Sequence, residues 1–352
     1  MAKRKTLPKD FGALLSSATT EELVAVFAKT LIDARGGYGK GTAIGFADCP
    51  DELVRWLVQQ GLDVDAADTY DRSPLWERAS LGRDQQIPLL LSLGADVHRP
   101  DLYGDTPLHA AVGNQRLAAT RALLGHGADP HRVNQRGATP LLHGLSRTSN
   151  IGIGAMAEIV RLLLDAGVTI TDEDRAQVTR IGEGFEFHRA GFNRDFLAAT
   201  DAGLSALYEL CDVQPVPRRN MHDGVSPITV TEGPWRDQYE DLWQLLVPSS
   251  GPAQTLQGEL VRITGKIARE IVGNGSANWG PDFKNMLQAI PRGLASGVAL
   301  PETDLQDARQ LAHALRGGND DGDAVARLSE LAVAWVRQNP TPIPRGEVGY
   351  DR

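Results

Sequence analysis

The chain repeats itself every 33 residues, and this period constrains the fold more than any other feature of the sequence. A triplet of Ser or Thr, Pro and Leu occurs three times, and a glycine recurs in step with it. The triplets begin at Ser73, Thr106 and Thr139, and the glycines are Gly61, Gly94 and Gly127. A further glycine, Gly167, comes 40 residues after Gly127, so the segment 146–155 is expected to hold an insertion. A fixed period of this length indicates a solenoid of stacked units.

Each period predicts a pair of helices. The Ser or Thr hydroxyl can cap the free N–H groups of a helix, and Pro is favoured at the first helical position. A second apolar run follows, such as the run IVRLLL from Ile159. The in-phase glycine then supplies the left-handed turn that ends many helices. The chain is expected to run out to a hairpin tip before the next triplet begins.

The best-formed copy is Thr106-Pro-Leu-His-Ala-Ala. It matches the T-P-L-H-x-A motif of the 33-residue ankyrin repeat. The copies at Ser73 and Thr139 match less closely, and a degenerate copy lies near Thr42. The sequence therefore resembles the ankyrin family. This resemblance implies a mainly α fold with an ankyrin-repeat solenoid, in which helix-turn-helix units alternate with β-hairpin loops.

The regions around the repeats show helical patterns. Thr19 with Glu22 predicts a capping box before a first helix, with an inner stripe of Val24, Phe27 and Leu31. Thr171 with Asp174 predicts a cap at the far end.

The predicted organisation is a helical cap at 1–36, about four ankyrin repeats at 37–170, capping helices at 171–212, a Pro-rich linker at 213–234, a helical region at 235–339 and a disordered tail at 340–352. The inner stripes of the two capping helices are expected to be Val178, Ile181, Phe185 and His188, then Phe196, Leu204, Leu207 and Cys211.

The C-terminal region is predicted to be all-α. One apolar face is formed by Leu256, Leu260, Ile263, Ile267 and Ile271. A helix beginning at Pro281 and two more at 302–316 and 323–338 complete the region. Segments such as FEFHR, PVPRRNMHDG and QGELVRITGKI are similar to those of a group of bacterial ankyrin-repeat proteins. That resemblance implies the architecture and a bacterial origin, and it implies no activity.

Composition and charge exclude some classes of function. The chain of 352 residues is 41% hydrophobic and has no apolar run long enough to span a membrane or to form a signal-peptide core. A cytoplasmic location is therefore expected. The net charge of −9 disfavours nucleic-acid binding and favours a basic partner. The alternative is that this acidity only keeps the protein in solution.

No motif supports catalysis, a cofactor or a metal. The segment Gly36–Thr42 does not match a phosphate-binding loop, because a glycine follows Lys40 where a hydroxyl residue is required. Asn319, Asp321, Asp323 and Glu330 have calcium-loop spacing, but Ala324 stands where the loop requires Gly. We expect Asp323 to cap the last helix instead. Scattered polar residues could join a site only if the fold brings them together: His188, Arg189, His222, Asp223, Glu259, Arg262 and Asn278.

The resemblance to ankyrin repeats implies protein binding on the concave face of the stack, and the expected function is that of an adaptor or of an inhibitor of the immunity type. The positions free to vary on this face are Tyr70, Arg72, Trp76, Tyr103, Asp105, Gln135 and Arg136. Exposed aromatic and Arg side chains are the usual anchors of an interface. The alternative for Tyr and Trp is that they pack between adjacent tips. A second class of function is a C-terminal enzyme or ligand-binding domain that uses the repeats as a platform. The sequence leaves open the partner's identity and the oligomeric state.

Overall fold

The computed structural model describes residues 3–319 and 321–350. The chain forms two compact units. The first, here called the repeat unit, comprises Met1–Phe185 and Asn193–Val216, and the second, the helical unit, comprises Glu186–Phe192 and Pro217–Arg352. Each unit is described by itself. Among the described residues, no helix is both long enough and apolar enough to cross a membrane.

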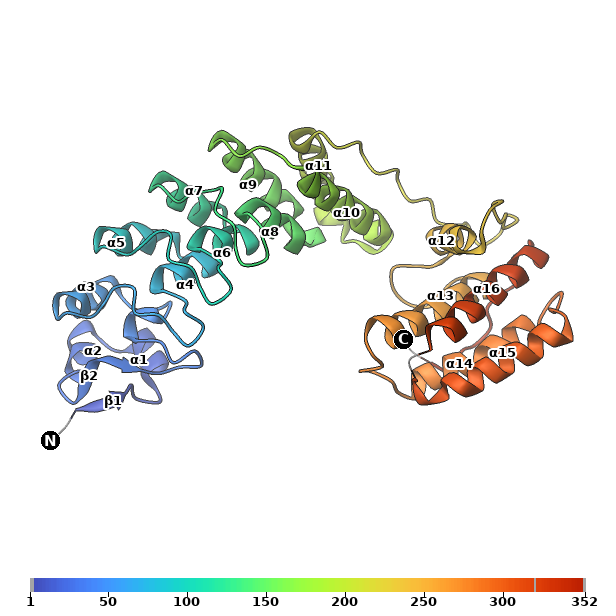
Figure 1. Ribbon diagram of the computed structural model, residues 1–352, viewed down its shortest axis with the longest axis horizontal. Coiled ribbons are helices and arrows are strands. Elements are labelled where there is room, and N and C mark those ends of the chain that lie inside the picture. Colours follow the sequence, from blue (N-terminus) through green and yellow to red (C-terminus); the bar gives the residue numbers. More distant parts are fainter. Residues whose placement is uncertain (1–2, 320, 351–352) are drawn as a thin grey trace. The chain divides into compact units, whose positions relative to one another are not determined.

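Three helix pairs form the centre of the repeat unit. Their bounds are α4 (Pro74–Leu81) with α5 (Ile87–Ser92), α6 (Pro107–Gly113) with α7 (Leu117–Gly125), and α8 (Pro140–Arg147) with α9 (Ile153–Asp165). The first helices α4, α6 and α8 pack on one another in one row, and the second helices form the row behind them (Figure 1). The predicted caps are confirmed, because the hydroxyls of Ser73, Thr106 and Thr139 each accept an N–H three residues on. The in-phase glycines have left-handed φ angles of 84 to 98°.

The degenerate first copy has lost its first helix. Ala43–Gly45 forms only a single 3-10 turn, η1, before α3 (Asp51–Gln59). Thr42 makes no side-chain cap, and only seven residues separate it from Pro50, the N-cap of α3, whereas nine residues hold α6 and its turn between the N-caps Thr106 and Arg116. Further 3-10 turns occur at η2 (Asp84–Gln86), η3 (Asn150–Gly152), η4 (Arg189–Gly191) and η6 (Leu315–Gly317). The expected insertion at 146–155 therefore contains η3 and the start of α9.

The N-terminal segment differs from the purely helical cap predicted for 1–36. It contains the helices α1 (Phe11–Ser17) and α2 (Thr20–Val26). It also contains two strands that pair in parallel, β1 (Arg4–Thr6) before the helices and β2 (Thr30–Arg35) after them. The capping box of Thr19 and Glu22 is present. Leu31, expected on a helical stripe, lies instead on β2. Local periodicity could not reveal this sheet, because its strands are separated by two helices.

Two long helices follow the last repeat, α10 (Asp172–His188) and α11 (Arg194–Cys211). The predicted cap before α10 is present: the Asp174 carboxylate accepts the Thr171 N–H at 2.9 Å. Helix α11 packs on α9, and Gly203 approaches the backbone of Gly154 so closely that a side chain at Gly203 would collide with it. Phe196 is 61% exposed, so its place on the predicted inner stripe was wrong. His188 is exposed as well.

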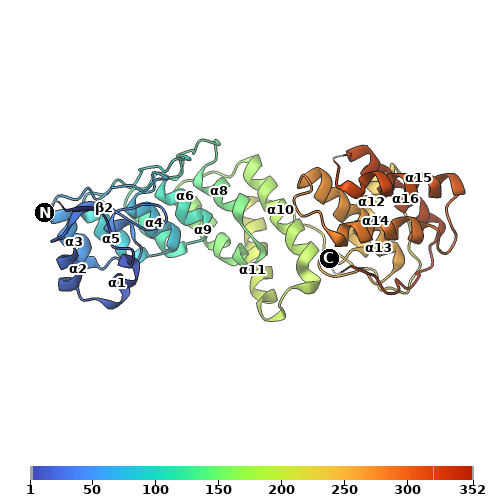
Figure 2. The same ribbon diagram turned by 90° about the horizontal axis from the view of Figure 1, so that it is seen from below.

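The helical unit is an all-α bundle (Figure 2). Its helices are α12 (Trp235–Leu246), α13 (Leu256–Ala268), α14 (Pro281–Leu294), α15 (Glu302–Ala314) and α16 (Gly322–Gln338), and a π-helical turn, η5 (Arg269–Gly273), extends α13. Helix α13 is central and packs against α12, α14 and α16. Leu260, Ile263, Ile267 and Ile271 are buried in its core, as the apolar face predicted.

The C-terminal segment differs from the disordered tail predicted for 340–352. The Leu256 N–H donates to the Ile343 carbonyl at 2.8 Å, and the Gln257 amide N–H donates to the Thr341 carbonyl at 2.7 Å. Tyr350 is buried in the core of the bundle. Residues 340–352 are mostly polar residues, Gly and Pro without a helical or strand period, so this packing could not be predicted from the sequence. Residues 351 and 352 lie outside the described part of the chain.

Candidate protein-binding surface

Each hairpin tip of the repeat unit is built around one acidic or amide side chain. These residues are Asp68, Asp101 and Asn134, spaced by 33 residues. In each case one side-chain oxygen accepts the backbone N–H groups two and four residues on, at 2.7 to 3.0 Å. Such turns fix the tip backbone locally. The 33-residue spacing of these three residues is the signal in the sequence from which the turns could have been predicted.

Neighbouring tips are joined by backbone hydrogen bonds. The N–H groups of Thr69, Leu102 and Gln135 donate to the carbonyls of the preceding tip at 2.9 to 3.1 Å. The first of these carbonyls belongs to Gly39, so the glycine-rich segment Gly36–Thr42 serves as the first tip of the row. The tips therefore form one continuous ladder, which presents its side chains in fixed positions.

Equivalent positions on this ladder carry Tyr70, Tyr103 and Arg136. Tyr103 is 49% exposed, Arg136 and its neighbour Gln135 are also exposed, and Tyr70 is half-buried. Tyr38, which is not among the seven predicted residues, is 94% exposed. A hydrogen bond with Tyr38 raises the pKa of Tyr70, which places the two phenols together. We call Tyr38, Tyr70, Tyr103, Gln135 and Arg136 the tip row.

The other selected side chains support the tips from behind. Trp76 is only 8% exposed, and its indole N–H donates to the Asp105 carbonyl at 3.0 Å. The Arg72 guanidinium stacks on Trp76 and Tyr70, at 4.5 and 5.0 Å from the ring centroids. The Asp105 carboxylate accepts the Asn134 amide N–H at 2.7 Å. For Trp76 the geometry thus agrees with packing between adjacent tips.

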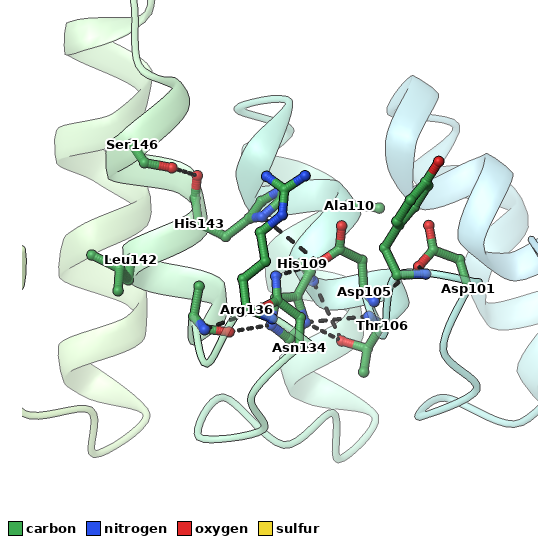
Figure 3. Close-up of polar contacts among 12 residues, drawn as sticks. Asp101, Asp105, Thr106, His109, Ala110, Asn134, Arg136, Leu142, His143 and Ser146 are labelled. Carbon is green, nitrogen blue, oxygen red and sulfur yellow. Dashed lines mark hydrogen bonds and ion pairs between the residues drawn. The ribbon is translucent and has the colours of Figure 1, made fainter.

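Two histidines lie behind the tip that is built around Asn134 (Figure 3). Nδ1 of His109 accepts the Thr106 N–H at 3.2 Å, so Nε2 carries the proton and donates to the Ala138 carbonyl at 3.0 Å. Burial lowers the pKa of His109 and of its neighbour His143. His143 also lies 3.7 Å from the Asp105 carboxylate. His109, the histidine of the repeat motif, therefore has a structural role and links two repeats.

The polar residues considered above as members of a site are distributed over separate clusters. Glu259 and Arg262 form a buried ion pair at 2.7 Å. Asn278 contacts Glu270 instead. Arg189 pairs with Glu186 at 2.6 Å, and His222 lies beside Asp223 at 3.8 Å. Asp223 accepts hydrogen bonds from Ser226 and Val225, which lower its pKa to about 2.

The calcium-spaced residues also have separate roles. Asp321, rather than the expected Asp323, caps α16 by accepting the Ala324 N–H at 2.9 Å. The Glu330 carboxylate pairs with Arg327 at 2.7 Å. Residue 320, within the same loop, lies outside the described part of the chain. Glu330 thus has a cationic partner within its own helix.

The repeat pattern has a counterpart among known protein families. A family model described as ankyrin repeats, in three copies, matches residues 79–174. No curated protein matches the chain. The matched segment runs from α4 into the start of α10 and leaves out the degenerate first copy. Ankyrin repeats are general protein–protein interaction modules. The fold is accordingly mainly helical, an ankyrin-repeat solenoid followed by an all-α region.

Proposed function

We propose that the repeat unit binds another protein through the tip row and the adjoining face of α4, α6 and α8. The observation that carries this proposal is the series of equivalent, exposed side chains on a hydrogen-bonded ladder of tips. Tyr and Arg are usual anchors of interfaces, and a backbone that is already fixed avoids the entropic cost of ordering the loop on binding. Arg72, Trp76 and Asp105 take part by holding the tips in place.

The partner we propose is basic. The protein carries 45 acidic and 36 basic residues, and three aspartates, Asp63, Asp71 and Asp96, are exposed on the hairpins. Opposite charge speeds encounter and suppresses wrong partners. An adaptor, or an inhibitor that covers the active site of a toxin or enzyme, would use a rigid surface in this way. We place this activity in a bacterial cytoplasm, where the unpaired, buried Cys49 and Cys211 would stay reduced.

The proposal is tested by capturing the partner and then changing the surface. The full-length chain serves as bait in a bacterial lysate, and the captured protein is identified by mass spectrometry and purified. A Tyr103→Ala, Arg136→Ala double variant should bind it at least tenfold more weakly, because such anchors dominate binding energy. Trp76 is left unchanged, since its removal would disturb the packing of the tips.

The matched control is Phe196→Ala, which removes an exposed aromatic side chain from α11 rather than from the tips. This variant should bind the partner as tightly as the unmodified protein does. If the double variant keeps full affinity, or if Phe196→Ala loses it, the tip row is the wrong surface.

A further inference from the structure

The helical unit contains a cavity of about 410 Å³ between α13, α14 and the C-terminal segment 345–350. This volume lies within the range of sites for small molecules. One side is apolar and consists of Leu256, Leu260 and Ile263 on α13, together with Ala289 on α14. The C-terminal segment closes the opposite side with Val348 and Tyr350.

The closing segment is held at two points. The Asn285 amide N–H donates to the Gly349 carbonyl at 2.8 Å, and the Tyr350 hydroxyl donates to the Glu259 carboxylate at 2.8 Å. Glu259 also accepts two N–H groups of Arg262, at 2.7 and 2.9 Å. The negative charge of Glu259 is therefore already compensated within the wall of the cavity.

Two guanidinium groups line the same cavity, and no carboxylate within residues 3–319 and 321–350 pairs with either of them. Arg292 lies in the last turn of α14, and Arg345 lies at the start of the closing segment. Among the residues that the structure describes, neither guanidinium takes part in an ion pair or a hydrogen bond. Arg292 is exposed and Arg345 is half-buried, and one further carboxylate of the lining, the exposed Glu347, offsets only one of these two positive charges. The cavity thus combines an apolar side with excess positive charge.

We propose that this cavity binds a small organic anion with an apolar body. The carboxylate or phosphate group of the ligand lies against Arg292 and Arg345, because the planar guanidinium fork matches both groups. The apolar body lies on Leu256, Leu260 and Ile263, where its burial removes hydrocarbon surface from water. This ligand site belongs to the helical unit and is separate from the protein-binding surface proposed above.

Titration calorimetry on the full-length chain tests the site with three probes of equal chain length: octanoate, octyl phosphate and the neutral octanol. At least one of the two anions should bind at least tenfold more tightly than octanol, and the tighter one identifies the preferred head group. Arg292→Gln and Arg345→Gln should each weaken the binding of that anion about tenfold, since each removes a charge-assisted hydrogen bond. Ala289→Leu should also weaken it, because the larger side chain fills the cavity.

The matched control is Arg309→Gln on α15, whose exposed guanidinium pairs with Glu302 outside the cavity. This variant should bind the anion as the unmodified protein does. Melting curves establish that each variant is folded before it is titrated. The proposal is overturned if neither anion binds at millimolar concentration, if octanol binds equally well, or if both arginine variants keep full affinity.

Discussion

His109 shows how one side chain can hold two repeats together. Its ring accepts the Thr106 N–H in its own repeat and donates to the Ala138 carbonyl in the next. His109→Ala would leave the buried Thr106 N–H without this acceptor, while the Ala138 carbonyl would keep only the Asn134 N–H, at a cost of about 1–3 kcal/mol in the free energy of unfolding. Urea denaturation measures this loss. His131→Ala, at an exposed position on the next hairpin, should change the same quantity by less than about 0.5 kcal/mol.

The same histidine predicts a dependence of stability on pH. Burial lowers the pKa of His109 in the folded protein, so the unfolded chain takes up a proton first as pH falls below about 6.5. Stability should therefore fall with decreasing pH, by at most about 1.4 kcal/mol per pH unit for this group. The measurement compares unfolding free energies at pH 7.5 and 5.5 in the unmodified protein and in His109→Gln. Equal pH dependence in the two proteins would contradict the assignment.

The side chains that build the tips make a paired prediction. Asp101 accepts the N–H groups of Tyr103 and Asp105, and Asn134 makes the equivalent bonds one repeat later. Asp101→Asn should therefore be tolerated, whereas Asp101→Ala should cost about 1–3 kcal/mol because the two N–H groups lose their acceptor. Thermal unfolding of both variants checks this. A loss of the same size in Asp101→Asn would show that charge, rather than hydrogen-bond geometry, holds the tip.

At the scale of elements, the local patterns in the sequence were sufficient for most helices. The hydroxyl residues before Pro and the in-phase glycines predicted where the repeat helices begin and end. The predicted apolar face of α13 was confirmed. Contacts between segments far apart in the chain could not be predicted. The parallel pairing of β1 with β2 and the insertion of Tyr350 beside Glu259 leave no periodic trace in the sequence.

The candidate surface was harder to predict than the helices. The 33-residue phase placed Tyr70, Tyr103 and Arg136 at equivalent positions, but it could not show that Trp76 is buried by the neighbouring tip. The exposure of Tyr38 depends on the conformation of the degenerate first copy. This conformation could not be predicted from the repeat motif, because the copy has lost its first helix. Side-chain exposure follows from packing between repeats, which a single repeat motif does not specify.

The loop between α15 and α16 gives a prediction for metal binding. Because Glu330 pairs with Arg327 and Asp321 caps α16, we expect millimolar calcium to leave the melting temperature unchanged. A ligand at a hundredfold excess over its Kd would stabilise the folded state by about 2.7 kcal/mol. A rise of several degrees that Glu330→Gln abolishes would instead establish a calcium site here.

At the scale of the whole molecule, the net charge of −9 bears on how a partner is found. If the captured partner is basic, long-range attraction should speed association, and salt should screen it. The association rate constant, measured by surface plasmon resonance, should fall steeply between 50 and 500 mM NaCl while the dissociation rate changes less. An association rate that does not depend on salt would contradict a basic partner.

The central claim is that the tip row contacts another protein, and site-specific photocrosslinking in living cells tests it most directly. A benzophenone amino acid is placed at position 103 in the tip row or at position 196 on α11, which is also an exposed aromatic position. We predict that illumination joins the variant labelled at 103 to one partner of defined mass, and that the variant labelled at 196 stays uncrosslinked. A partner captured from position 196 but not from position 103 would contradict the claim, and so would no crosslink at either position.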